Sequence, residues 1–131
     1  MESNNRKNGT RFERRLAKLI SDHGYWVHIM AQSVAGQPFD VIAVKNQTAY
    51  AIDCKVCAND VFKLTRIEPN QASAMTLWNE CGNGSGWIAL ELSDRSIYML
   101  SYVQLMELMT THHILNKACI TTEGIALEDW V

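Results

Sequence analysis

The sequence predicts an α/β fold in which a mixed β-sheet is flanked by helices. Apolar residues recur at helical spacing from Phe12 to Ile20, which indicates an amphipathic helix. Two apolar runs, 39–44 and 49–52, lie on either side of a short polar link and indicate a β-hairpin. A second helix, two more strands and a short helix after Ser101 follow. The predicted order is therefore helix, three strands, helix, two strands, helix (α-β-β-β-α-β-β-α).

The first helix is predicted to begin at Thr10, which is a good N-cap residue, and to end before Gly24. Residues 1–9 are polar and precede the first apolar position of the helical pattern. We expect them to form a flexible basic arm that carries Arg6 and Lys7.

The middle of the chain alternates predicted strands, loops and one helix. A strand is expected at 25–30, followed by a loop of small residues at 31–36. Residues 56–67 show no regular spacing of apolar side chains. Pro69 suits the first turn of the second helix, which is expected to run toward Cys81.

The last third of the chain predicts two more strands and a helix. The strands are expected at 87–92 and 96–100, and Ser101 is a suitable N-cap for the helix. Residues 111–131 indicate only an ordered C-terminal tail of unknown role. The chain has 131 residues, of which 47% are hydrophobic, so we expect one domain that spans 1–131.

Charge is distributed unevenly along the chain. The net charge is −2, yet residues 1–67 hold ten of the twelve Lys and Arg and six of the fourteen acids, a balance of +4. The remainder balances at −6. A positive first half is suited to a phosphate backbone, and the alternative is an ordinary solvated surface.

Targeting signals and disulfides are not indicated. No stretch has the roughly 18 consecutive apolar residues of a membrane span, and the N-terminus lacks the apolar core of a signal peptide, so we expect a cytoplasmic protein. Its four cysteines are then expected to be reduced. Cys54 and Cys57 form half of a zinc motif that nothing completes, which favours packed thiols over metal ligands.

The predicted hairpin gathers charged side chains at one point. Asp53 and Lys55 project to the same face of a strand, whereas Cys54 projects to the other. If Asp40 lies where the neighbouring strand passes that face, two carboxylates and an ammonium converge there. Such a cluster is costly unless a cation fills it. The alternative interpretation is an exposed cross-strand ion pair that contributes little.

Glu13 has two explanations at this stage. Thr10 and Glu13 have the spacing of a capping box, which by itself accounts for a glutamate at this position. Glu13 also shares one side of the helix with Leu16 and Ile20, which would direct its carboxylate toward the body of the protein.

These residues together resemble the active-site pattern of a known nuclease superfamily. The pattern consists of a helix with Glu13, then Asp40 near a strand start, then Asp53-x-Lys55 on the next strand and Gln71 on a later helix. It resembles that of the PD-(D/E)xK nuclease superfamily. The restriction-endonuclease-like fold of this superfamily is the α/β arrangement predicted above. Within it, residues 10 to about 92 look most like Holliday-junction resolvases of the RecU and archaeal type, including phage-encoded relatives.

Two departures from the family pattern stand out. Phe39 is interposed in the family's Pro-Asp pair, and Asp53 replaces the more usual glutamate. The resemblance nevertheless implies a metal-dependent endonuclease that cleaves DNA phosphodiester bonds and nicks four-way junctions symmetrically. The alternatives are another nuclease of the superfamily, acting on duplex or single strands, and a non-catalytic nucleic-acid-binding domain of the same fold.

The resemblance also implies roles for the site residues. Asp40, Asp53 and the main-chain carbonyl of Cys54 are expected to bind Mg²⁺, which Mn²⁺ could replace, and Glu13 to complete that shell or bind a second ion. Lys55 would orient the attacking water or stabilise developing charge. Gln71 would position water or phosphate, or else is simply a solvated helix residue.

The symmetry of the expected DNA substrate suggests the oligomeric state of the protein. A four-way junction has two-fold symmetry, so we expect a homodimer with two active sites on branched DNA. The candidate phosphate-binding residues include basic side chains on the outer side of the first helix. Those on the helix are Arg11, Arg14, Arg15 and Lys18. The other candidates are Arg6, Lys7, Lys45, Lys63 and Arg66.

Overall fold

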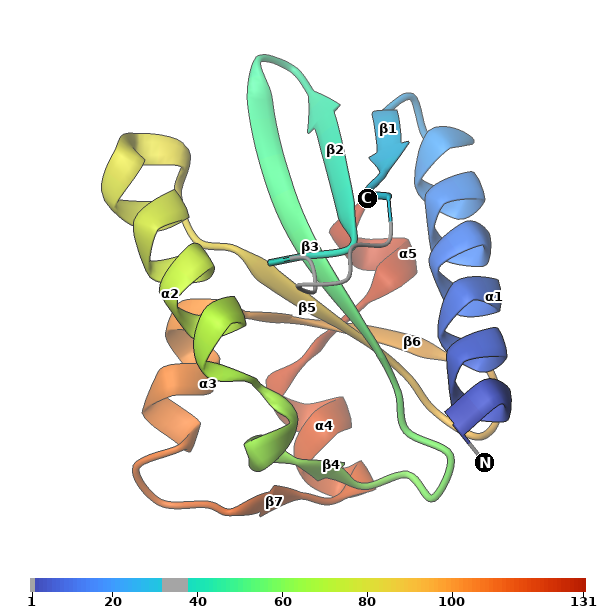
Figure 1. The fold of residues 1–131 in the computed structure, drawn as a ribbon, viewed down its shortest axis with the longest axis vertical. Helices are drawn as coiled ribbons and strands as arrows, with labels where there is room; N and C mark the ends of the chain where they lie inside the picture. The colour runs from blue at the N-terminus through green and yellow to red at the C-terminus, as the bar shows by residue number, and fades with distance from the viewer. Residues whose placement is uncertain (1, 32–37) are drawn as a thin grey trace.

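The computed structural model describes residues 2–31 and 38–131, and within them a six-stranded mixed sheet lies between helices (Figure 1). The predicted fold class is confirmed. In spatial order the strands are β1 (Trp26–Ile29), β2 (Val41–Lys45), β3 (Thr48–Val56), β5 (Trp87–Glu91), β6 (Ile97–Ser101) and β8 (Ile125–Ala126). A second, two-stranded sheet pairs β4 (Phe62–Lys63) with β7 (Ile114–Leu115).

The helices of the described chain connect these strands and cover their faces. They are α1 (Glu2–Ser21), α2 (Pro69–Trp78), α3 (Tyr102–Leu108), α4 (Lys117–Glu123) and α5 (Leu127–Trp130), with short turns η1 (Leu64–Arg66) and η2 (Asn79–Asn83). In Figure 1, α1 and α2 stand on opposite sides of β2 and β3. No helix in the described residues is long and apolar enough to cross a membrane.

The β2–β3 hairpin fixes the register on which the site depends. Its polar link turns at Asn46 and Gln47, whose φ angles of 52° and 66° are those of a tight hairpin turn with the twist of the flanking strands. Val41 is therefore paired with Ile52 in an antiparallel ladder. The β3–β5 pair is parallel, and the connection between these strands carries α2.

Each face of the sheet has its own core, because strand side chains alternate. Ile52 packs in a cluster with Phe12, Leu16 and Ile20 of α1. Its neighbour Ala51 faces the opposite cluster, which holds buried residues of α2, α3 and α4. The Cys57 thiol is 1% exposed within that second cluster, and burial raises its pKa to about 11. The interpretation of this cysteine as a packed thiol fits its position.

The predicted start of the first helix is wrong. α1 begins at Glu2, so residues 2–9 are its first turns and not a separate flexible arm. Thr10 therefore lies inside the helix and caps nothing, which removes the capping-box explanation of Glu13. A suitable N-cap residue begins a helix only where the preceding backbone leaves the helical conformation. The asparagines and glycine before Thr10 weaken a helix without ending it.

The C-terminal segment is more than a tail, since residues 111–131 form β7, α4, β8 and α5. Leu115, Ile120 and Leu127 are buried, and the Trp130 ring stacks on Tyr25 at 5.7 Å between centroids. The segment therefore closes both cores. The predicted small-residue loop lies, from position 32 onward, outside the described residues.

Candidate active site

The hairpin places Asp40 across from Asp53. Asp40 immediately precedes β2, and its main-chain N donates a hydrogen bond of 2.9 Å to the Ile52 carbonyl. Paired residues in a sheet project to the same face, so the two carboxyl groups lie together. They are 9% and 1% exposed, respectively. The Cys54 main-chain N donates a hydrogen bond of 2.7 Å to Asp40 Oδ2, a contact that sequence analysis missed.

Lys55 and Gln71 enclose Asp53 from the side of α2. The Lys55 Nζ lies 3.4 Å from Asp53 Oδ2, and Gln71 Nε2 donates a hydrogen bond of 3.0 Å to Asp53 Oδ1. Gln71 Oε1 accepts from Lys55 Nζ at 3.3 Å. The alternatives of an exposed ion pair and a solvated glutamine do not hold for this buried network.

Glu13 reaches the same cluster from α1. Its side chain is buried, and burial raises the Glu13 pKa to about 7, with further contributions from the charge of Asp40 and a hydrogen bond with it. Burial also raises the pKa of Asp53 well above its usual range, an effect that Lys55 opposes and Asp40 reinforces. The three predicted acids are therefore together, and the raised pKa values of Glu13 and Asp53 favour their protonation when no cation is near.

The carboxylates suit a hard cation in chemistry but are not yet arranged around one. Within the described residues, no three His, Cys, Asp or Glu side chains form a group that could hold a metal ion. Asp40 Oδ2 and Asp53 Oδ1 are engaged by Cys54 N and Gln71 instead. Asp53 Oδ2 is the exception: it is buried with no hydrogen-bond partner among the described residues, and it forms an ion pair with Lys55. A buried carboxylate oxygen left in this way fits a site for Mg²⁺ or a similar ion.

Comparison with known proteins agrees with this geometry. The profile of a family described as archaeal Holliday junction resolvase (Hjc) matches residues 4–131. The chain belongs to the Hjc family. A crystal structure of Hjc from the archaeal hyperthermophile Archaeoglobus fulgidus, a Holliday junction resolvase, has a similar fold, with a TM-score of 0.71, 19% sequence identity and 94% coverage of each chain. Comparison with curated proteins gave no match.

The family membership confirms the predicted resemblance and the function class. This Hjc-family protein is a metal-dependent nuclease that resolves junctions by hydrolysing DNA phosphodiester bonds, and it acts on branched DNA in recombination.

Two of the basic residues predicted to lie on the outer side of the first helix of this resolvase face its sheet instead. Arg11 Nη2 and Arg15 Nη1 form ion pairs of 2.7 Å and 2.6 Å with Glu91, whose side chain is 2% exposed. Arg14 and Lys18 are exposed as expected, although Lys18 is paired with Asp22. The acid at position 91, within the apolar run 87–92, was the signal in the sequence that a cationic partner was needed.

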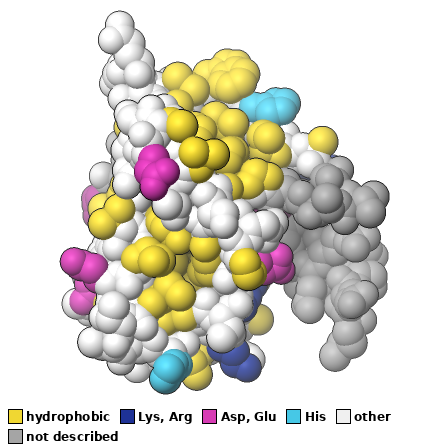
Figure 2. All heavy atoms as spheres, turned by 60° about the vertical axis from the view of Figure 1, so that its left-hand side comes forward, with side chains coloured by type: hydrophobic (Ala, Val, Ile, Leu, Met, Phe, Trp, Pro, Cys, Tyr) yellow, Lys and Arg dark blue, Asp and Glu magenta, His cyan; other side chains and the backbone are white. Residues whose placement is uncertain are grey.

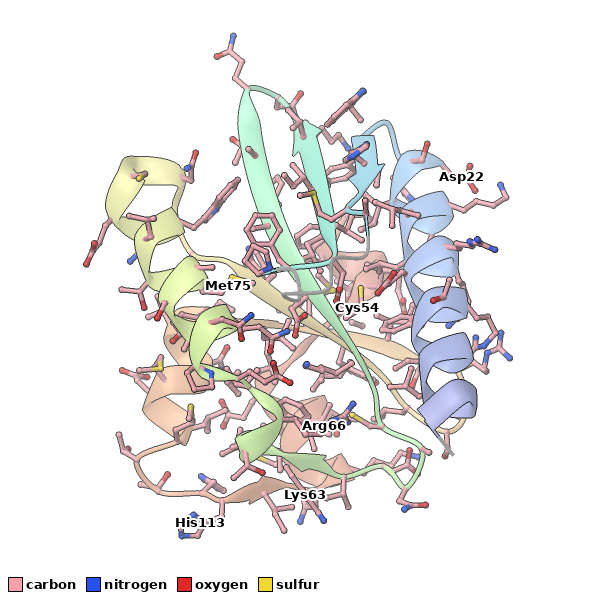
Figure 3. The ribbon with its side chains drawn as sticks, in the orientation of Figure 1. Asp22, Cys54, Lys63, Arg66, Met75 and His113 are labelled. Atoms are coloured by element: carbon pink, nitrogen blue, oxygen red, sulfur yellow. The ribbon has the colours of Figure 1, made fainter. Side chains whose placement is uncertain are left out.

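The other predicted DNA contacts of the resolvase are dispersed. Lys45 Nζ donates to the His23 carbonyl and lies over the Tyr25 ring. Arg66 and Lys63 lie below Cys54 in Figure 3, near β4. Arg6 and Lys7 lie in the first turns of α1, and their side chains are outside the described part of the chain.

Proposed function

We propose that this Hjc-family protein cuts DNA by magnesium-dependent hydrolysis at the cluster of Glu13, Asp40, Asp53, Lys55 and Gln71, and that manganese can replace magnesium. The observation that carries the proposal is Asp53, which is 1% exposed and hydrogen-bonded to Gln71 through one oxygen, while its other oxygen has no hydrogen-bond partner in the described part of the chain. Burying a carboxylate oxygen without a hydrogen bond costs free energy, and a bound cation would offset that cost.

The protein residues divide the work by their chemistry. Asp40, Asp53 and the Cys54 carbonyl, with Glu13, would hold the cation, after the carboxylates turn from their present hydrogen bonds. When bound, Mg²⁺ would neutralise the acids and supply positive charge to stabilise the charge that develops on the phosphate. Lys55 Nζ, which donates to Gln71 Oε1, would orient the attacking water or stabilise charge on the phosphate oxygens. Gln71 keeps Lys55 and Asp53 in fixed relation.

The test is the Asp53→Asn variant, which removes one charge with almost no change in shape. We expect cutting of a labelled four-way junction in Mg²⁺ to fall by about a thousandfold or more, since a ligand and its charge are lost. Junction affinity should stay equal or increase. Asp22→Asn, at an exposed acid immediately after α1, is the matched control and should cut normally. Full activity of Asp53→Asn would reject the assignment.

The same proposal includes a homodimer that nicks the junction symmetrically. A two-fold substrate needs two related active sites, and apolar side chains are available for an interface. Figure 2 shows hydrophobic side chains grouped on the face that carries α2 and α3. The exposed ones include Leu77 at 60%, Val103 at 51% and Met106 at 46%. The phage origin and the cytoplasmic location stay predictions.

A further inference from the structure

A groove opens directly beside the proposed catalytic lysine. Its volume is about 540 Å³, and Lys55, Asn59, Lys63 and Arg66 are among its lining residues. This volume lies in the range of about 300–1,000 Å³ that is typical of small-molecule sites. In Figure 3, Cys54, Arg66 and Lys63 follow one another from the centre of the sheet toward β4, and all three line the groove.

Gly9 is the residue that α1 contributes to the described lining of this groove. Glycine in a helix interior destabilises the helix relative to other residues, so its presence needs a reason. The backbone gives none, because Gly9 is not among the residues with positive φ. Packing against the described residues gives none either, because a Cβ built at Gly9 would meet none of their atoms within 4 Å. The side of α1 at Gly9 is open, and glycine keeps it open.

The charge of the groove suits an anion. Lys63 is exposed, and its side chain makes no hydrogen bond or ion pair with any described residue. Arg66 donates one hydrogen bond of 2.8 Å to the Val56 carbonyl, which leaves further guanidinium donors. No Asp or Glu is among the described lining residues. The nearby acid Asp60 already accepts two hydrogen bonds from Ser93.

We propose that this groove binds the nucleotide adjacent to the scissile phosphate. The missing side chain at Gly9 lets the sugar-phosphate backbone pass close to α1, and Lys63 contacts a phosphate. The proposal rests on the proposed function, since it takes the scissile phosphate to lie at Lys55. A strand that continues from Lys55 along the groove would pass Arg66 and then reach Lys63.

The first test fills the groove from α1. Gly9→Gln, made in the Asp53→Asn background so that binding is read without cutting, should raise the Kd for a labelled four-way junction by about tenfold. The same change should raise Tm by about 2 °C, because glutamine is a better helix residue than glycine. Ala118→Gln, at an exposed residue of α4, is the matched control and should leave Kd unchanged. An unchanged Kd for Gly9→Gln would overturn the proposal.

The second test removes the unpaired cation. Lys63→Ala should reduce the slope of log K against log salt by about one phosphate contact, that is by about 0.9. Lys117→Ala removes the same charge from an exposed site outside the groove lining and should not change the slope. Equal slopes for Lys63→Ala and the parent would overturn the role of Lys63.

The failure of this proposal is distinguishable from that of the proposed function. If the wild-type protein fails to cut junctions while Gly9→Gln weakens binding, the proposed cutting site is wrong and the groove stands only as a DNA-binding site. If the wild-type protein cuts and Gly9→Gln binds as tightly as its parent, the groove assignment is wrong and the chemistry stands.

Discussion

Glu13 links the chemistry of the site to the stability of the fold. Its pKa is raised to about 7, mainly by burial and then by Asp40. Below the ordinary pKa of a glutamate, both the folded and the unfolded protein bind the proton and stability is unaffected. As pH rises toward 7, the unfolded chain releases its proton while the folded chain retains it, so the folded state loses stability. Asp53, whose pKa is also raised, acts in the same direction.

This reasoning predicts a pH effect for Glu13→Gln in cation-free solution. The Tm of the wild-type protein in a chelator should fall between pH 5 and pH 8 by about 5 °C more than that of the variant, because glutamine does not ionise. Glu107→Gln, at an exposed acid on α3, should retain the wild-type dependence. Parallel Tm curves for Glu13→Gln and wild type would mean that Glu13 does not titrate within the cluster.

Individual site residues were predictable to different degrees. Asp40 and Asp53 followed from the hairpin, because strand alternation and register depend on local sequence. The inward position of Glu13 followed from its spacing with Leu16 and Ile20. The hydrogen bond from Cys54 N to Asp40 could not be predicted, since it depends on β3 extending past the start of β2, a tertiary feature.

At the scale of elements, Gln71 joins the start of α2 to the site. Its Oε1 also accepts a hydrogen bond of 3.2 Å from Glu68 N, immediately before the helix. Gln71→Ala should therefore lower stability by about 1 kcal/mol and slow junction cutting by about tenfold to a hundredfold. Asn70→Ala, at an exposed residue of the same turn, should change neither. If the cutting rates of the two variants agree well below Tm, Gln71 serves only the helix.

Two adjacent arginines of α1 have different expected roles, Arg15 in stability and Arg14 in DNA binding. Arg15 compensates the buried Glu91, so Arg15→Ala should lower the free energy of unfolding by about 2 kcal/mol. Arg14 is exposed and should change stability by less than about 0.5 kcal/mol, yet Arg14→Ala should reduce the salt slope of junction binding by about 0.9. Denaturation and binding titrations on both variants measure this contrast. An unchanged slope for Arg14→Ala would place this face of α1 outside the DNA path.

Elements long enough to repeat their spacing of apolar residues several times were predicted, and two-residue strands were not. The long α1 and the β2–β3 hairpin repeat their apolar spacing often enough to be recognised. β4, β7 and β8 have two residues each, so no period exists to detect. They form because tertiary contacts hold them, as when Leu115 of β7 is buried against the core under α2 and α3.

At the scale of the whole molecule, the C-terminal segment completes both layers around the site. Trp130 contacts the rings of Tyr25, Tyr50 and Trp87, which belong to segments distant in sequence. These contacts support β3 and β5 from the α1 face. Packing between segments distant in sequence produces no local pattern, and residues 111–131 show only scattered apolar residues. Sequence analysis therefore assigned this segment no role.

The proposed dimer makes a prediction that only the assembled molecule can satisfy. Each protomer would carry one site, so a mixed dimer of wild-type and Asp53→Asn subunits should cut one of the two symmetric strands. On a supercoiled plasmid with an extruded cruciform, wild-type dimers should give linear DNA through paired nicks. Mixed dimers should give nicked circles, whose share should rise and then fall as the fraction of Asp53→Asn increases. If each protomer acted alone, the variant would only dilute activity and the ratio of linear to nicked product would not depend on mixing, which would contradict the dimer.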